Sequence, residues 1–254
     1  MNPTTTAPAP VDLRTLPPYA PTPLTDLSKP EHKAAFEQAL AAVRGRLGEE
    51  HPLVIGGERL KGERTFESRN PARPAEVIGR FQAGNAAQAS QAVETGHRAF
   101  ASWSRVPARE RAAYLVEAAR RMRDRKHVFS AWLVYEVGKS WAEADADTAE
   151  AIDFLEFYAR EMLRYDQPQP VTQLPGERGS MVYLPLGVGA VIPPWNFPLA
   201  ILVGMSSAAI VTGNTVVLKP ASDTPGIAWQ FFALMEEIGL PAGVLNFVTG
   251  GGAS

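Results

Sequence analysis

The second half of the chain alternates between short apolar stretches and helical stretches, and this alternation limits the folds open to it. Residues 188–192, 215–218 and 244–248 are predicted to be buried strands. The first two strands are separated by an apolar helix over residues 197–212, and the last two by a helix over residues 224–239. A β-α-β-α-β order with short links predicts a parallel sheet with right-handed crossovers.

The region before this unit is predicted to be mainly helical, with one small antiparallel ribbon. Strand-like segments and a Gly-Gly turn place the ribbon within residues 53–82. A further short strand is predicted over residues 181–184. Residues 1–27, rich in Pro, Thr and Ala, are predicted to be an extended or poorly ordered arm. Residues 28–254 are therefore predicted to be an α/β unit, a Rossmann-like parallel-sheet domain preceded by helices and the ribbon.

Several helix details follow from spacing. Ser28 and Glu31 have the spacing of a capping box at the start of the first helix. Thr224 is predicted to cap the helix that begins at Pro225. The inward face of the helix over residues 86–103 is predicted to carry Ala89, Val93, Gly96 and Phe100. The charge run Glu143, Asp145, Asp147 and Glu150 favours a solvated helix face.

The composition excludes several classes of protein. The net charge is −2, so a broad basic surface and nucleic-acid binding are not expected. No apolar run is long enough to span a bilayer, and the N-terminus resembles neither a secretory signal nor a transit peptide. We therefore expect a cytoplasmic protein without a membrane partner. The sequence has 0 cysteines, which excludes disulfides and a cysteine nucleophile within these residues. Its histidines lack metal-ligand spacing, so no metal site is expected.

Ligands of open parallel sheets bind beyond the carboxyl ends of the strands. Three segments follow the predicted strands directly, at residues 193–196, 219–222 and 250–252. The glycines of the last segment allow the backbone to approach a flat ligand, although a flexible turn is the more frequent reason for such a run. Any cofactor is expected to contact these segments.

Two residues in these segments offer chemistry and each has an alternative role. The Asn196 side chain is a neutral donor suited to an oxyanion that forms only in a transition state. It could equally be a helix N-cap, which local sequence alone favours by roughly three to one. Lys219 could bind phosphate or ribose hydroxyls, or be a solvated strand-end lysine. Trp195 could line a pocket or fill the core.

Three blocks of sequence resemble the aldehyde dehydrogenase superfamily in their order and spacing. They are GVGAVIPPWNFP at residues 187–198, GNTVVLKPAS at 213–222 and GLPAGVLNFV at 239–248. The segment EVGKSWAEA at residues 136–144 is also similar to the family, and the resemblance covers roughly residues 50–254. Within the superfamily, residues 135–139 and 147–158 look most like the pyrroline-carboxylate dehydrogenases, which oxidise glutamate semialdehyde to glutamate in proline breakdown.

The resemblance implies roles for individual residues. Asn196 matches the oxyanion-hole asparagine, and Lys219 matches the lysine that binds the hydroxyls of the adenine-side ribose. Gly252 matches a glycine near the adenine. The segment that lines the cofactor cleft is matched by Ile192, Pro193, Pro194 and Trp195.

Ser222 departs from the family pattern, in which many members have a glutamate that holds the ribose hydroxyls and repels a 2′-phosphate. Serine removes that charge. NAD is therefore the expected cofactor, with NADP tolerated.

The resemblance further implies a cysteine thiolate that attacks the aldehyde, hydride transfer to the nicotinamide, and a glutamate that activates water. In the family, that cysteine and that glutamate lie beyond the point that corresponds to Ser254. We therefore expect the N-terminal part of a longer homo-oligomeric enzyme, incomplete at its catalytic domain and inactive alone. Three alternatives remain open: a non-catalytic nucleotide-binding module, an interaction protein whose partner supplies the thiol, and an aldehyde dehydrogenase of other specificity.

Overall fold

The computed structural model describes residues 7–12 and 14–251, and its centre is a parallel sheet. Strands β6 (Val188–Val191), β7 (Thr215–Leu218) and β8 (Leu245–Phe247) pair in parallel, and the full order of the sheet is β3-β2-β8-β7-β6. The predicted β-α-β-α-β unit is confirmed, but the prediction that residues 188–192 are buried is wrong, because β6 lies at the edge of the sheet and only Val191 of the strand is buried. The register aligns Val191 with Leu218 and Leu218 with Phe247, so all three strands end at the same edge.

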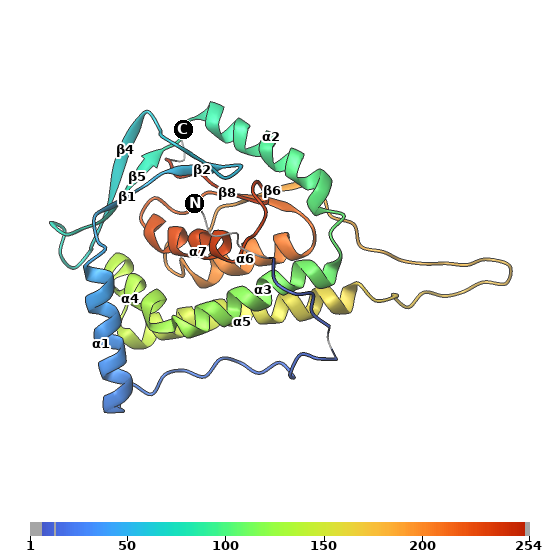
Figure 1. Ribbon diagram of the computed structural model, residues 1–254, viewed down its shortest axis with the longest axis horizontal. Coiled ribbons are helices and arrows are strands. Elements are labelled where there is room, and N and C mark those ends of the chain that lie inside the picture. Colours follow the sequence, from blue (N-terminus) through green and yellow to red (C-terminus); the bar gives the residue numbers. More distant parts are fainter. Residues whose placement is uncertain (1–6, 13, 252–254) are drawn as a thin grey trace.

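Helices cover both faces of this sheet (Figure 1). Helix α2 (Ala86–Trp103) lies on one face, and helices α6 (Ala200–Val211) and α7 (Pro225–Glu237) lie on the other. Because α6 is covered by strands on one side and by helices on the other, its nearly uniform apolar sequence is mostly buried.

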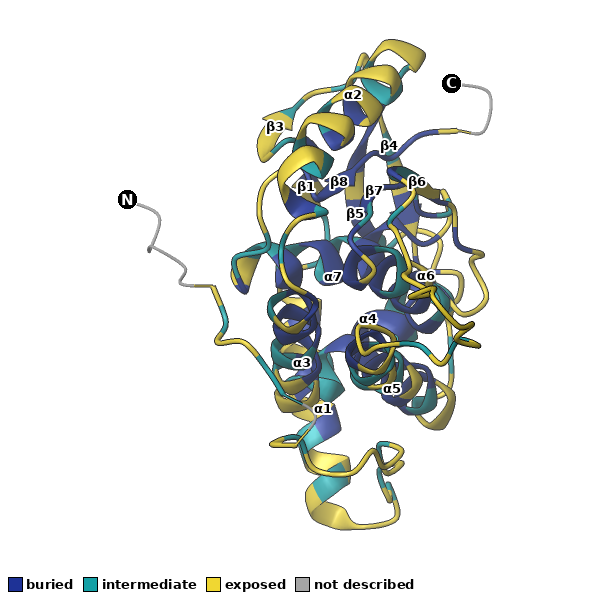
Figure 2. Cartoon of the chain, turned by 90° about the vertical axis from the view of Figure 1, so that its right-hand side faces the viewer, coloured by how far each residue is buried: buried dark blue, intermediate teal, exposed yellow. Residues whose placement is uncertain are grey.

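A helical layer packs against α6 and α7 on the side away from the sheet (Figure 2). It consists of α3 (Ala108–Asp124), α4 (Lys126–Val137) and α5 (Trp141–Tyr165), with α1 (Pro30–Arg44) packed against α4. Gly138 ends α4 as its C-cap with a left-handed φ of 74°, a conformation that glycine adopts readily. Within the described ranges, no helix has both the length and the apolarity needed to cross a membrane.

The predicted ribbon is in fact two separate pieces. β2 (Leu53–Ile55) and β3 (Glu58–Leu60) form a hairpin around the Gly-Gly turn, and β2 joins the main sheet through Val54 opposite Phe247. A second sheet has the order β1-β5-β4, built from β1 (Glu49–His51), β4 (Arg64–Arg69) and β5 (Val77–Ala83). Strands β1 and β5 pair in parallel, which a purely antiparallel ribbon does not allow.

The inward face of α2 is only partly as predicted. Gly96 is buried, Ala89 and Phe100 are half-buried, and Val93 is 42% exposed. The other buried residues of α2 are Ala92 and Trp103. The helix lies close to the sheet at Gly96: its carbonyl oxygen accepts a hydrogen bond of 3.1 Å from Thr215 Oγ1, and a Cβ atom at this position would lie only 3.0 Å from Val188 Cγ1.

Residues 181–184 do not form the predicted strand. They lie in a loop over residues 166–187 that projects from the body of the molecule (Figure 1). No neighbouring strand among the described residues pairs with them, and a strand without a hydrogen-bonded neighbour is not stable.

The described part of the N-terminal arm is extended and runs along the helical layer (Figure 1). The backbone amide of Thr22 donates to Asp153, and Arg160 donates to the carbonyl of Pro17. The predicted capping box of α1 is wrong, because the hydroxyl of Ser28 donates to Asp26 instead. Residues 1–6 lie outside the described residues.

Candidate functional site

Three loops follow the carboxyl ends of the parallel strands, and we refer to residues 192–199, 219–224 and 248–251 as the strand-end loops. Backbone hydrogen bonds join the start of one loop to the last residue of the neighbouring strand: Lys219 N donates to Val191 O at 2.9 Å, and Val248 N donates to Leu218 O at 3.0 Å. The three segments that the sequence predicted to surround a ligand therefore begin side by side.

The first strand-end loop presents several side chains to the surface. Ile192 is 61% exposed and Trp195 is 58% exposed, so Trp195 is not a core residue. Pro194 and Asn196 are also exposed, whereas Pro193 is buried. The loop has the exposure of a surface that could line a ligand site.

Asn196 is not the N-cap of α6. The helix begins at Ala200, whose backbone amide donates a 2.8 Å hydrogen bond to Asp147 Oδ1 of helix α5. The Asn196 side chain has no hydrogen-bond partner within residues 7–12 and 14–251. The capping alternative is thereby excluded, and the amide remains available as a donor.

Asp147 belongs to a buried ion pair beneath this loop. Its side chain is 0% exposed, and Lys139 Nζ lies 2.7 Å from Asp147 Oδ2. The same ammonium group lies 4.0 Å from the ring centroid of Phe197, in the first strand-end loop. Burial raises the pKa of the Asp147 carboxyl, and the hydrogen bond and charge of Lys139 offset part of that rise.

The charge run on α5 is thus only half solvated. Glu143 and Glu150 are exposed, but Asp145 and Asp147 are buried. Asp145 pairs with Lys126 at 2.8 Å and also accepts hydrogen bonds from the backbone amide and hydroxyl of Thr25 in the arm. Burial raises the pKa of Asp145, but the hydrogen bonds from Lys126 and Thr25 outweigh it, and the net shift is downward.

A second buried carboxylate holds the helix that follows the second strand-end loop. Glu136, near the end of α4, accepts 2.7 Å hydrogen bonds from the backbone amides of Gly226 and Ile227 and a 2.8 Å bond from the hydroxyl of Ser68. Burial raises the pKa of Glu136 to about 7, against the opposing effect of these three donors. The side chain of Thr224, predicted to cap α7, makes no capping bond.

Sequence reasoning did not single out Glu136. The available signal was that Glu136 is the one acid in the apolar stretch of residues 128–137. A lone carboxylate in a buried stretch requires partners, and here two helix amides and a hydroxyl supply them.

The second strand-end loop carries Lys219 and Ser222. The ammonium group of Lys219 donates to the carbonyl oxygen of Pro220 at 3.2 Å, and the hydroxyl of Ser222 donates to the carbonyl oxygen of Gly250 at 3.3 Å. The latter bond connects the second strand-end loop to the third. A lysine and a hydroxyl at neighbouring strand ends are donors suited to ribose hydroxyls, so these residues fit the nucleotide half of a dinucleotide. Gly252 lies outside the described residues.

A cleft of about 430 Å³ adjoins these loops. Trp195 and Ser222 line it together with Glu136, so two of the residues predicted for the cofactor site meet in one cleft. Asn196 and Lys219 are not among its lining residues.

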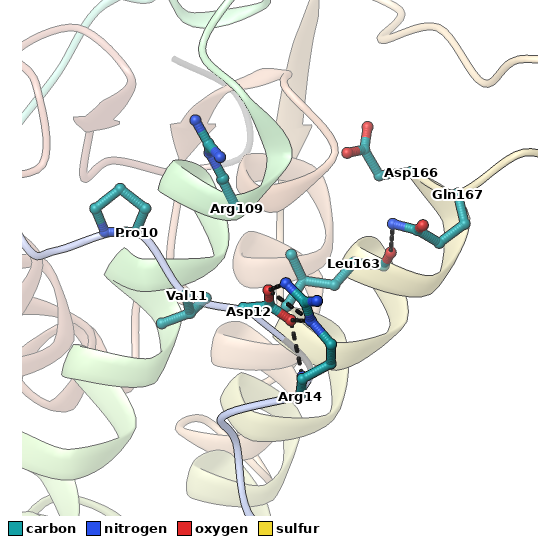
Figure 3. Close-up of a pocket in the computed structure, with 8 residues that line it drawn as sticks. All are labelled: Pro10, Val11, Asp12, Arg14, Arg109, Leu163, Asp166 and Gln167. Carbon is teal, nitrogen blue, oxygen red and sulfur yellow. Dashed lines mark hydrogen bonds and ion pairs between the residues drawn. The ribbon is translucent and has the colours of Figure 1, made fainter.

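A larger cleft, of about 630 Å³, lies away from the strand ends, between the arm and helices α3 and α5. Figure 3 shows Arg14 folded against Asp12, while the side chain of Arg109 points away from this pair. The charged groups that line this larger cleft therefore do not converge on a common point.

The part of the chain that the structure describes holds no group of three or more His, Cys, Asp or Glu that could bind a metal ion.

These features define a class of protein: an α/β fold with a candidate ligand site at the carboxyl ends of a parallel sheet, where a neutral amide, a lysine and a hydroxyl lie in loops at the same edge. The chain belongs to the aldehyde dehydrogenase family, whose sequence profile matches residues 59–254. The Rossmann-like fold predicted from the sequence is the fold of this family's solved members.

Two curated relatives illustrate the similarity in sequence. A 1-pyrroline-5-carboxylate dehydrogenase of Geobacillus thermodenitrificans is 54% identical over 236 residues, which are 93% of this chain and 46% of that protein. The 1-pyrroline-5-carboxylate dehydrogenase 2 of Bacillus subtilis is 52% identical over 236 residues, with the same coverage of 93% and 46%. The chain thus spans about half the length of the relatives it matches.

Solved structures of 1-pyrroline-5-carboxylate dehydrogenases are similar to the chain in both fold and sequence. A 1-pyrroline-5-carboxylate dehydrogenase from Thermus with bound NAD has a TM-score of 0.91 at 43% identity, covering 94% of this chain and 47% of that chain. The delta-pyrroline-5-carboxylate dehydrogenase of Mycobacterium tuberculosis bound with NAD has a TM-score of 0.84 at 31% identity, covering 93% and 45%.

Proposed function

We propose that this chain forms the cofactor-binding part of an enzyme that oxidises L-glutamate γ-semialdehyde to glutamate with NAD. The observation that carries the proposal is the exposed amide of Asn196, which caps no helix and follows a strand end beside the Lys219 loop. The names of the similar proteins support the choice of aldehyde.

Each strand-end loop has a part in this function. Asn196 donates to the oxyanion that forms when the aldehyde carbon is attacked, a contribution of about 3 kcal/mol in comparable sites. Lys219 and Ser222 bind the hydroxyls of the adenine-side ribose, and Gly252 lies near the adenine. The cofactor cleft is lined by Ile192, Pro193, Pro194 and Trp195.

The reaction converts an aldehyde, water and NAD into a carboxylate, reduced NAD and two protons. NAD accepts the hydride when it is bound. These residues supply no attacking thiol, since the sequence holds 0 cysteines, and the resemblance to the family assigns the carboxylate that activates water to a later part of the sequence. We propose that both come from sequence beyond Ser254, so that this piece alone does not turn over. Residues 1–27 would form the arm and residues 28–254 the cofactor-binding unit of a cytoplasmic homo-oligomer.

The test is an assay of the full-length native polypeptide with L-glutamate γ-semialdehyde and NAD, followed by the absorbance of the reduced nicotinamide. Turnover that requires both compounds supports the proposal. Activity only with other aldehydes would contradict the proposed identity of the substrate. Nucleotide binding without turnover of any aldehyde would favour a non-catalytic binding module.

The role of Asn196 has a matched control in Asn85. Asn85 caps α2 through its side chain, which accepts a bond from the amide of Gln88. Asn196→Ala is expected to lower kcat by about a hundredfold to a thousandfold, with stability unchanged. Asn85→Ala is expected to lower stability by about 1 kcal/mol and leave kcat unchanged. Unaltered turnover in Asn196→Ala would remove the oxyanion role.

A further inference from the structure

Hydrogen bonds anchor the first strand-end loop near its two ends, while residues 192–196 between them make none within the described part of the chain. At its start, Val191 O accepts a hydrogen bond from Lys219 N, and at its end Ala200 N donates to Asp147. Among the described residues, no hydrogen bond reaches residues 192–196. The conformation of Asn196 therefore depends on what holds the residues that flank it.

Asp147 and Lys139 hold the downstream flank in two ways. One carboxylate oxygen of Asp147 accepts from the first amide of α6, and the other pairs with Lys139. Lys139 in turn lies over the ring of Phe197, the residue directly after Asn196. A single buried ion pair thus contacts the loop at Phe197 and at Ala200, one and four positions beyond Asn196.

We propose that Asp147, acting through Lys139, Phe197 and the start of α6, is a positioning residue that fixes the amide of Asn196 where the reaction needs it. This proposal rests on the function proposed above. A displacement of about 1 Å in a reacting or stabilising group lowers a rate by on the order of a hundredfold. Because Asp147 is fully buried and the side chain of Lys139 is only 10% exposed, removing one partner leaves a poorly solvated charge, and we expect the loop to rearrange around it.

The chain contains a closely matched control. Asp145 lies two positions earlier on the same helix, is similarly buried, and pairs with Lys126 at 2.8 Å, but its other contacts go to Thr25 of the arm. Loss of Asp145 should lower the stability of the fold to a similar extent without changing the conformation of the strand-end loops. Comparing the two positions separates positioning from general stability.

The experiment measures hydrogen exchange of peptides covering residues 192–200, together with kcat and KM for NAD, in the full-length polypeptide. Asp147→Ala is expected to accelerate exchange in that segment at least tenfold and to lower kcat tenfold to a hundredfold, with KM for NAD within twofold. Asp147→Asn, which keeps the acceptor for Ala200, is expected to recover part of both effects. Asp145→Ala is expected to change neither exchange in this segment nor kcat by more than twofold.

A second readout tests whether the effect passes through Asn196. In an Asn196→Ala background, Asp147→Ala is expected to lower kcat by less than a further twofold. An undiminished further loss would overturn the proposal. So would unchanged exchange over residues 192–200, or an equal loss of kcat in Asp145→Ala. If Asp147→Ala does not fold, Lys139→Met with Lys139→Arg as its rescue decides the same question.

The outcomes also distinguish this proposal from the function on which it rests. Absence of aldehyde oxidation in the unaltered polypeptide would refute the proposed function. Exchange over residues 192–200 would still decide whether Asp147 holds the loop, since that measurement needs no substrate.

Discussion

The buried carboxyl of Glu136 predicts a stability that depends on pH between about 5 and 7. Burial raises its pKa from an ordinary 4.5 to about 7. At 1.36 kcal/mol for each tenfold change in the ionisation constant, this difference corresponds to about 3 kcal/mol. In a chain of this size, that amounts to a change of about 6–12 °C in melting temperature.

The direction follows from the raised pKa. The folded protein holds the proton of Glu136 more tightly than the unfolded chain does, so this stabilising contribution is complete below pH 4.5 and is lost as the pH rises through 7. Glu136→Gln cannot ionise. The melting temperature of the native sequence minus that of Glu136→Gln is therefore expected to fall as the pH increases from 4.5 to 7, and to stay constant above.

The assay is a series of thermal melts at fixed ionic strength across this pH range. Glu94→Gln, at an exposed position of α2, serves as the control and is expected to show no such trend. A difference between native and Glu136→Gln that is flat from pH 4.5 to 7 would refute the reasoning. It would mean that the amides of Gly226 and Ile227 and the hydroxyl of Ser68 keep the carboxylate ionised throughout.

Two further predictions concern single residues. Ser222→Glu places a carboxylate in the second strand-end loop and is expected to raise KM for NADP at least tenfold while KM for NAD changes little; equal effects on both would argue against a ribose contact at this position. Gly96→Ala puts a methyl group 3.0 Å from Val188 Cγ1, so either α2 or the side chain of Val188 must shift, and we expect a loss of about 1–3 kcal/mol in chemical denaturation; unchanged stability would show that the neighbours give way without cost.

The sheet could be predicted from the sequence because its inner strands β7 and β8 are buried on both faces and its helices have a clear apolar pattern. β7 and α2 have the bounds that the pattern indicated. Residues 181–184 have a comparable pattern but form no strand, because a strand exists only where a neighbour pairs with it. Strand pairing depends on the tertiary structure and cannot be predicted from a local sequence pattern.

The acids of α5 show a related limit. Glu143, Asp145, Asp147 and Glu150 are indistinguishable as a charge run, yet two are solvated and two are buried. The difference is set by lysines on neighbouring elements: Lys126 of α4 faces Asp145, and Lys139 of the α4–α5 connection faces Asp147. Charge composition alone favours a solvated face because an unpaired buried acid is costly, and the pairing that removes this cost is visible only in the fold.

A long-range contact likewise decides between the two possible roles of Asn196, helix N-cap and oxyanion donor. Frequency favours an asparagine before a helix as its cap, but that rule assumes that the capping group is local. Here both Rossmann-like helices are capped from a distance, α6 by Asp147, 53 positions earlier, and α7 by Glu136, 90 positions before Gly226. Buried acids from the helical layer satisfy the helix amides, so Asn196 and Thr224 need not do so. The strand-end loops are thereby left free to present their side chains to a ligand, which is the arrangement that a site at the edge of a parallel sheet requires.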